Sequence, residues 1–155
     1  MSRSLSVELR SQVRERARAR CEYCLVPDFP SFFAHETDHI IAEQHGGEAI
    51  PENPAFSCMQ CNRAKGTNIA SVDPATRQPV FLFNPRRDAW AEHFELEGAS
   101  IVGFERNGRA TASLLKFNER ERLGFRALLL RQDAIRSRLC NARWEFGYLF
   151  LHFLI

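Results

Sequence analysis

The chain has 155 residues, a length that fits one domain with an appendage and is short for two domains of ordinary size. Its 45% apolar and 26% charged residues exclude wholesale disorder, and it has no run of about 18 apolar residues that would predict a membrane-spanning helix. The net charge of +2 implies no particular partner. The arginine-rich segment 1–20 lacks the apolar core of a secretory signal, so we expect a cytoplasmic protein with no membrane partner.

The charge is distributed unevenly along the chain. Residues 1–20 carry +4 and residues 116–143 carry +5, whereas residues 21–115 carry −6. Of the 21 basic residues 19 are arginines, whose planar guanidinium suits phosphate better than the lysine ammonium does. The pattern fits a protein that grips a polyanion with its flanks, and it fits solvated helix faces equally well. The candidate phosphate contacts of the first flank are Arg14, Arg16, Arg18 and Arg20.

Residues 7–18 are predicted to form the first helix. Ser6 can cap its N-terminus, and arginines occupy the side away from the apolar positions. These apolar positions recur at four-residue spacing: Leu5, Leu9, Val13 and Ala17. Residues 25–37 then indicate a loop that turns into a strand, which ends over residues 37–42 before Gly46-Gly47.

The middle of the chain predicts short elements. Residues 51–57 contain two prolines and indicate a loop or a short edge strand. The residues after Cys61 suggest a short helix that ends near Gly66. Asn68 begins a predicted loop that leads to a strand over residues 79–83.

Strands and helices alternate in the last third of the chain. Residues 93–97 and 100–105 predict two strands, and Asn107-Gly108 predicts a tight turn before a short helix over residues 109–116. The elements together predict a small α+β protein.

A longer helix is predicted over residues 119–141, with Asn118 as its cap. Its apolar positions have helical spacing: Leu123, Ala127, Leu130 and Ala134. Residues 144–155 are aromatic-rich without a polar face, and the sequence assigns them no role.

Four of the five cysteines form two C-x-x-C pairs that are separated by 33 residues: Cys21 with Cys24, and Cys58 with Cys61. A two-residue gap lets both thiolates of a pair reach one tetrahedral ion, so two pairs complete a structural zinc site. A redox-active C-x-x-C would explain one pair but hardly two. Cys140 is left over and is expected to pack as a small hydrophobic residue.

Polar residues of catalytic type lie between the two cysteine pairs and directly after the second: Asp38, His39, Asn53 and Asn62. Each has an ordinary alternative, because an Asp-His dipeptide is common in loops and an asparagine is usually a turn or cap residue. Asn62 in particular could cap the helix that follows Cys61. Their joint occurrence around the cysteine pairs favours a catalytic interpretation.

This set of side chains suits phosphodiester hydrolysis, which needs a water nucleophile, a base and a cation. An imidazole exchanges protons near neutral pH, which suits His39 as the base. Asp38 and Asn62 supply oxygen ligands for Mg²⁺ or Mn²⁺, and Asn53 could fix the His39 tautomer by accepting from its second N–H. Adjacent strand residues point to opposite faces, so Asp38 and His39 share a site only if the strand ends or bulges there.

The segment 21–68 resembles the HNH endonuclease family, the ββα-metal nucleases. The residues that carry the resemblance are Cys21-Glu-Tyr-Cys24, Asp38-His39-Ile40, His45-Gly46-Gly47, Asn53 and Cys58-Met-Gln-Cys61-Asn62-Arg-Ala-Lys65. The resemblance implies a treble-clef-like hairpin and helix around one catalytic metal, with a four-cysteine zinc knuckle beneath. The chain length and the predicted elements indicate one domain over residues 1–155, with an N-terminal helix before this segment and a strand and helix extension over residues 69–155.

The resemblance also implies roles for single residues. His39 would be the general base, Asp38 and Asn62 the ligands of the catalytic cation, and Asn53 the residue that orients His39. Asn62 stands where the family name records a third histidine, a variant that many members with this zinc knuckle share. Lys65, one helical turn beyond Asn62, is a candidate phosphate contact. Weaker candidates for contacts to the nucleic-acid backbone are Arg63, Arg86 and Arg87.

The function implied is metal-dependent cleavage of DNA that leaves 5′-phosphate and 3′-hydroxyl ends. Two rivals remain: a zinc-stapled nucleic-acid-binding module without catalysis, and a protein-interaction domain that keeps only the knuckle. Asp38, His39 and Asn62 favour the enzyme, because a binding module does not need them.

Overall fold

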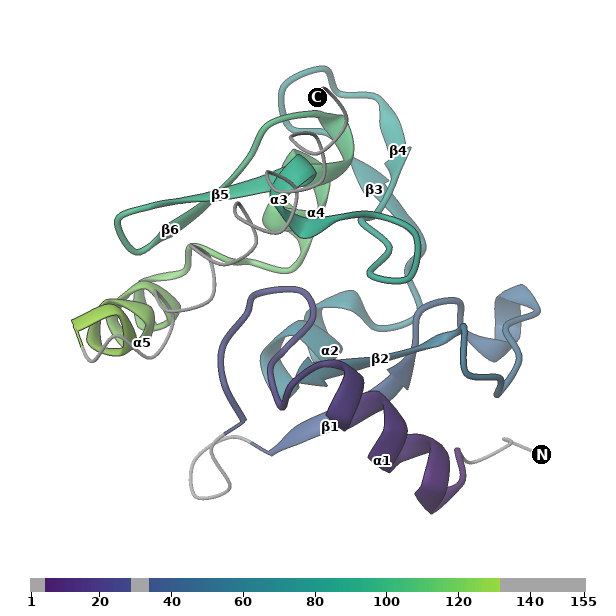
Figure 1. The fold of residues 1–155 in the computed structure, drawn as a ribbon. Coiled ribbons are helices and arrows are strands. Elements are labelled where there is room, and N and C mark those ends of the chain that lie inside the picture. The colour runs from purple at the N-terminus through teal and green to yellow at the C-terminus, as the bar shows by residue number, and fades with distance from the viewer. Residues whose placement is uncertain (1–4, 29–33, 132–155) are drawn as a thin grey trace, which may run out of the picture.

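The computed structural model describes residues 5–28 and 34–131, which are coloured in Figure 1. The predictions for Cys140, for residues 132–141 of the last helix and for residues 144–155 fall outside these ranges. No described helix is both long and apolar enough to cross a membrane.

The described elements are α1 (Val7–Arg16), β1 (His35–His39), the 3-10 helix η1 (Glu43–His45), β2 (Pro54–Cys58), α2 (Met59–Lys65), β3 (Ala70–Val72), β4 (Pro79–Phe81), α3 (Trp90–His93), β5 (Phe94–Glu97), β6 (Ser100–Gly103), α4 (Arg106–Leu114) and α5 (Arg120–Arg131). Helices together with three antiparallel strand pairs confirm the α+β prediction.

The predicted N-terminal helix is α1. Ser6 Oγ accepts a hydrogen bond of 3.1 Å from the Leu9 N–H, as expected of an N-cap, and the helix ends at Arg16 rather than at residue 18. Leu5 and Val13 are buried, so the four-residue apolar spacing does mark the inner face. This face packs against both strands of the β1–β2 hairpin (Figure 1).

The β1–β2 hairpin carries the first half of the molecule. Its register runs unbroken from His35 opposite Cys58 to His39 opposite Pro54. The region predicted as a loop or short edge strand is a strand from Pro54 onward, with the proline at the first position, where its missing N–H is tolerated. β2 is buried along its whole length because α1 and α2 contact it.

The helix α2 follows β2 without a connecting loop. Cys58 is its N-cap, with Sγ accepting from the Cys61 N–H, and Gly66 follows its last residue as predicted. Because the helix already begins at Met59, Asn62 lies inside it and does not cap it. The alternative role of Asn62 as a cap is therefore excluded.

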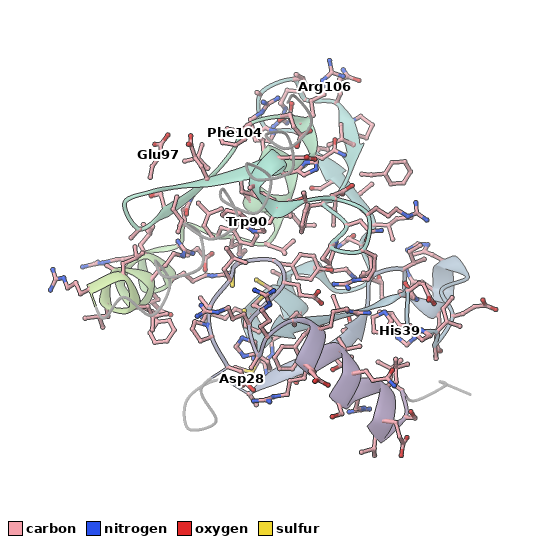
Figure 2. All side chains as sticks on the ribbon, viewed as in Figure 1. Asp28, His39, Trp90, Glu97, Phe104 and Arg106 are labelled. Atoms are coloured by element: carbon pink, nitrogen blue, oxygen red, sulfur yellow. The ribbon has the colours of Figure 1, made fainter. Side chains whose placement is uncertain are left out.

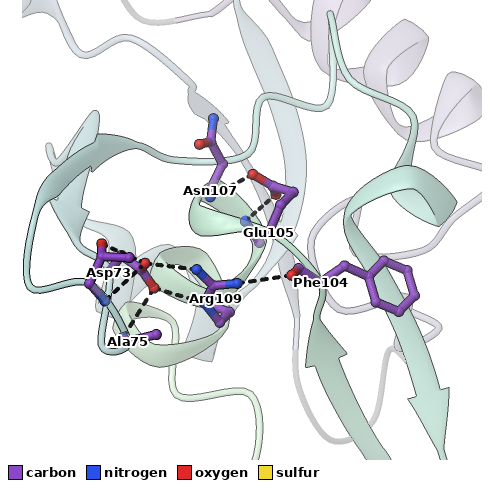
Figure 3. A network of polar contacts seen from close by, with 8 residues as sticks. Asp73, Ala75, Phe104, Glu105, Asn107 and Arg109 are labelled. Carbon is purple, nitrogen blue, oxygen red and sulfur yellow. Dashed lines mark hydrogen bonds and ion pairs between the residues drawn. The ribbon is translucent and has the colours of Figure 1, made fainter.

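The stretch predicted as a loop before residue 79 contains the strand β3, which pairs with β4. Asp73 orders the turn between them by accepting from the Ala75 and Thr76 N–H groups. Arg109 of α4 donates to both oxygens of the same carboxylate, at 2.9 and 2.8 Å (Figure 3). This guanidinium holds the pKa of Asp73 well below its usual range. The ion pair fastens the β3–β4 hairpin to α4.

The strands β5 and β6 confirm the two strand predictions, and Gly98 supplies the left-handed conformation at their turn (φ +59°). The predicted Asn107-Gly108 turn is wrong. Both residues lie in the first turn of α4, where Glu105 accepts from their N–H groups as the N-cap. A Cβ on Gly108 would lie 2.4 Å from the His93 carbonyl oxygen, so this glycine permits a close backbone approach instead of a turn.

The last described helix, α5, departs from its prediction in two ways. Asn118 was expected to cap it, but its amide accepts from the Ile101 N–H at 2.9 Å and donates to the Ile101 carbonyl at 2.8 Å. Leu123, Ala127 and Leu130 have the predicted helical spacing, but they are only partly buried. The fully buried residues of α5 are Arg122, Arg126 and Leu129.

One hydrophobic core joins the segment 21–68 to the extension. Its buried residues are Cys21, Tyr23, Cys24, Ile40, Ala55, Cys58, Cys61, Phe83, Phe94, Ile101, Leu115 and Phe117. Polar contacts reinforce the junction: Trp90 Nε1 donates to the Tyr23 carbonyl at 2.9 Å, and Arg86 pairs with Glu22. Arg86 thus has a structural role at this junction.

Candidate metal centre and active site

The four paired cysteines meet in one buried cluster. Their Sγ atoms all lie within 4.8 Å of one another, and the Cys24 and Cys58 sulfurs are 3.7 Å apart. Four thiolates around a tetrahedral zinc ion, with Zn–S distances of about 2.3 Å, are separated by about 3.8 Å. All four thiols are free, so the cluster fits a zinc ion and agrees with the predicted four-cysteine site.

The charges that ionised thiols would place in this buried cluster also favour a bound cation. Burial raises the pKa of the Cys21 and Cys61 thiols, whereas hydrogen bonds from the other cysteines, Cys21 first, lower the pKa of Cys24. Several thiolates at this separation repel one another. A zinc ion ionises its thiol ligands outright, and it would therefore stabilise an arrangement that the thiols alone do not favour.

The cysteine cluster positions the start of α2. Cys21 and Cys24 lie on the turn that follows α1, whereas Cys58 and Cys61 begin α2. Asn62 directly follows the fourth cysteine, so an ion held by the four sulfurs would fix this asparagine relative to the β1–β2 hairpin.

An acidic face of β1 lies beside Asn62. Because side chains alternate along a strand, Glu36 and Asp38 share one face of β1. Asn62 reaches this face from α2, and its Nδ2 donates to Glu36 Oε2 at 2.5 Å. The structure thus brings two predicted cation ligands, Asp38 and Asn62, to the same side of the hairpin and adds Glu36. The sequence analysis missed Glu36, although its place two residues before Asp38 was a usable signal.

His39 is the last residue of β1 and lies beside the loop that carries η1 (Figure 2). The strand ends here without a bulge, which meets one of the two conditions under which Asp38 and His39 could share a site. The His39 Nε2 is buried and has no hydrogen-bond partner among the described residues. Leaving a buried polar atom unsatisfied costs free energy, so this imidazole is not committed to a structural contact.

Asn53 does not reach the His39 ring as predicted. Its Oδ1 accepts from the Ile41 N–H, and its Nδ2 donates to the carbonyls of Ile41 and Glu48, each at 2.9 Å. Gly47 packs so closely here that a Cβ on it would lie 1.7 Å from the Ile41 carbonyl oxygen. The correction has a simple cause: the loop backbone offers Asn53 three partners at short range. Asn53 closes the loop that begins directly after His39.

The prediction that Lys65 contacts phosphate is also wrong. Lys65 is 3% exposed, and its Nζ donates to the His39 carbonyl at 2.9 Å and to the Gly66 carbonyl at 3.1 Å. Burial lowers its pKa, and the nearby Asp38 carboxylate opposes this shift. Lys65 therefore ties the end of α2 to the end of β1.

Three of the four candidate arginines of the first basic flank have partners within the chain. Arg14 pairs with Asp28 at 3.1 Å. Arg16 donates to the carbonyls of Pro51 and Pro54 at 2.8 and 2.9 Å, and Arg20 donates to the Leu25 carbonyl at 3.3 Å. The contacts of Arg16 hold the end of α1 against the start of β2. These three arginines therefore have structural roles besides any contact with a polyanion.

Comparison with known proteins agrees with this geometry. Residues 21–68 match the family model described as HNH endonuclease. The chain is also 22% identical over 125 residues to the Septu protein PtuB of Bacillus thuringiensis, an alignment that covers 79% of this chain and 46% of that protein. The chain thus spans less than half the length of this relative. No solved structure matches the chain. With its four clustered cysteines, the segment 21–68 is a domain of the HNH endonuclease family.

Proposed function

We propose that the protein is a metal-dependent endonuclease that hydrolyses phosphodiester bonds in DNA. The observation that carries the proposal is the meeting of Asn62 with the acidic face of β1, the strand that ends at His39, whose Nε2 has no partner among the described residues. A zinc-stapled binding module would need the cysteines, but it would not need this second set of polar groups. The family match of residues 21–68 supports the same function.

His39 is the proposed general base. A base must have a free ring nitrogen to take the proton of the attacking water, and the His39 Nε2 has no partner among the described residues. Lys65 holds the His39 carbonyl, and Asn53 closes the loop that follows. These contacts fix the backbone on both sides of the imidazole, which favours a constant position relative to a bound phosphate.

Asp38 and Asn62 are the proposed ligands of a catalytic Mg²⁺ or Mn²⁺. Because the Asn62 Nδ2 donates to Glu36, its Oδ1 is the group left for a cation. A carboxylate and an amide oxygen are the donors that a hard divalent cation prefers. When bound, such a cation supplies charge neutralisation for the phosphate and for the departing oxygen.

We also propose that residues 1–155 form one domain in the cytoplasm. The core shared by the segment 21–68 and the extension supports a single domain. Free thiols in a zinc-fitting cluster support a reducing compartment, where cysteines are not drawn into disulfides.

A nicking assay on supercoiled plasmid tests the function. We expect nicking with Mg²⁺ or Mn²⁺ and none with EDTA, and we expect His39→Ala to lower the rate by about 10²–10⁴, the range for one general base. The matched control is His45→Ala, an exposed histidine of the η1 segment, which should cleave like the wild type. Melting temperature and zinc content should be equal in all three proteins. Equal cleavage by His39→Ala and the wild type would show that the activity does not come from this site.

A further inference from the structure

Two arginines lie on the buried face of α5. Arg122 and Arg126 stand one helical turn apart and are 6% and 1% exposed. Neither forms an ion pair with a carboxylate of the described residues. Burying an unpaired charge is costly, so the fold must balance these two charges by other means.

The cysteine cluster lies against these arginines. Arg122 Nη2 donates to Cys61 Sγ at 3.0 Å, and its Nη1 donates to the Leu115 carbonyl at 2.5 Å. Arg126 donates to the carbonyls of Phe117 and Ala99, which link α5 to the end of α4 and to the β5–β6 turn.

When all four cysteines are ionised, a divalent ion makes the charges balance. Four thiolates carry −4, and a zinc ion reduces this to −2. Two guanidinium groups supply the +2 that makes the buried assembly neutral. We propose that Arg122 and Arg126 are the counter-charges of the zinc–thiolate centre, so that zinc binding and the docking of α5 stabilise each other. Such coupling is reciprocal by thermodynamic necessity.

Zinc affinity tests the proposal without any reference to catalysis. Arg122→Met removes the charge and keeps much of the side-chain length, and it should weaken zinc binding by about 10- to 100-fold, the range for a partner of a metal ligand. Competition with a zinc chelator of known affinity measures this. The control is Arg120→Met on the exposed side of α5, which should bind zinc like the wild type. Equal zinc affinity of Arg122→Met and the wild type would overturn the proposal.

Two further measurements separate this coupling from a general loss of stability. Arg122→Lys keeps the charge, so it should restore at least part of the zinc affinity, whereas a purely steric role would not distinguish lysine from methionine. Hydrogen exchange of zinc-loaded Arg122→Met should speed up in residues 120–131 more than in α4. Unchanged protection of α5 would contradict the coupling, because α5 would then dock without its counter-charge.

A different observation concerns a cavity of about 270 Å³ between the end of β1 and the extension. Ile40, which directly follows His39, lines it together with the buried Leu82 and Phe83. Phe81 stands at the same cavity with 68% of its side chain exposed. An apolar lining with an exposed aromatic ring is a surface on which a flat ring can stack.

Polar groups with unused hydrogen-bonding capacity also line this cavity. Asn84 Oδ1 accepts from the Arg86 N–H, and Asp88 Oδ2 accepts from the Asn84 N–H, which leaves Asn84 Nδ2 and Asp88 Oδ1 available. The side chains of Arg87 and Asn107 form no hydrogen bond with the described residues. Amide and carboxylate groups match the donor and acceptor edges of nucleobases.

We infer that this cavity holds an unpaired nucleobase of the DNA strand next to the cleavage site, an inference that rests on the proposed function. Fluorescence anisotropy with the zinc-loaded full chain and a labelled single-stranded oligodeoxycytidine, in buffer without added Mg²⁺ or Mn²⁺, tests it. Phe81→Ala should weaken binding by about tenfold or more, as loss of one stacked base does. The matched control is Phe104→Ala, an exposed phenylalanine outside the cavity.

The outcomes of this experiment are separable from those of the nicking assay. Equal loss of affinity, or no loss, in Phe81→Ala and Phe104→Ala would overturn the base site even if the wild type nicks plasmid. A selective loss in Phe81→Ala with no plasmid nicking would instead support the base site and reject the nuclease.

Discussion

The cysteine cluster and the acidic face of β1 belong to the same small module and are built in opposite ways. No cysteine of the cluster is more than 4% exposed, and all four approach one another closely. Glu36 is exposed, and Asp38, His39 and Asn62 are only partly buried. A structural ion can be enclosed because nothing has to enter or leave, whereas a site for a polyanion must stay open to it. The module thus combines an enclosed cysteine cluster with an acidic face of β1 that is accessible to solvent.

The largest effect on stability should follow from removing one cysteine of the cluster. Cys58→Ser removes one of the four proposed zinc ligands and leaves a serine that can still cap α2, so the loss reports on the metal site. Structural zinc contributes about 10 kcal/mol or more in small zinc-dependent folds, which is comparable to the whole stability of a domain. We expect little folded protein and a loss of bound zinc, measured by circular dichroism and metal analysis. Cys140→Ser, outside the two pairs, is the control for zinc content. Purified wild type without zinc would contradict the assignment.

Substitutions at the acidic face of β1 and at Asn62 should leave the fold intact and remove the proposed nuclease activity. Asp38→Ala should lower cleavage by about 10²-fold or more at low Mg²⁺, since charge neutralisation by a metal supplies several kcal/mol, and excess metal should rescue part of the loss. Asn62→Asp keeps an oxygen ligand and should retain activity, whereas Asn62→Leu should not. The measurement is the nicking rate against metal concentration at matched melting temperature. A loss that metal does not rescue in Asp38→Ala would argue against a ligand role.

A smaller effect should come from the loop that joins the two regions. Asn53 is 7% exposed, and its amide makes three hydrogen bonds to the loop backbone. Asn53→Ala should lower the free energy of unfolding by about 2 kcal/mol or more, because buried backbone groups lose their partners. Urea unfolding measures this. Zinc content should not change, and a stability equal to that of the wild type would show that water replaces the amide without cost.

The smallest effect on either region should come from the extension. Arg109 holds the pKa of Asp73 below its usual range, so this carboxylate stabilises the fold above the pKa of the unfolded chain, and the stabilisation is lost as the pH falls toward the folded value. Asp73→Asn should therefore lower stability at neutral pH and make melting temperature less sensitive to acid below about pH 4. Zinc content and nicking per folded molecule should stay the same. An unaltered acid profile would contradict the role of the ion pair.

Local sequence patterns predicted the helices and strands correctly where the residues that form the pattern are close to one another in the chain. Ser6 caps α1, Gly66 ends α2, and the two strands around Gly98 form as expected. The errors occurred where a distant group overrides the local signal. Gly108 looked like a turn residue, but it lies in α4 because His93 approaches its backbone. Asn118 looked like a cap, but the edge of β6 takes its amide.

The sequence by itself determined the two C-x-x-C pairs and the Asp38-His39 dipeptide, because two-residue spacing and strand ends are local properties of the chain. Only the tertiary structure decided the partners of these groups. It brought Asn62 to Glu36 across 26 residues and Arg122 to Cys61 across 61 residues, and it turned Asn53 toward the loop instead of toward His39. Such pairings depend on which buried donors and charges find partners once the core has formed, and that competition involves the whole fold.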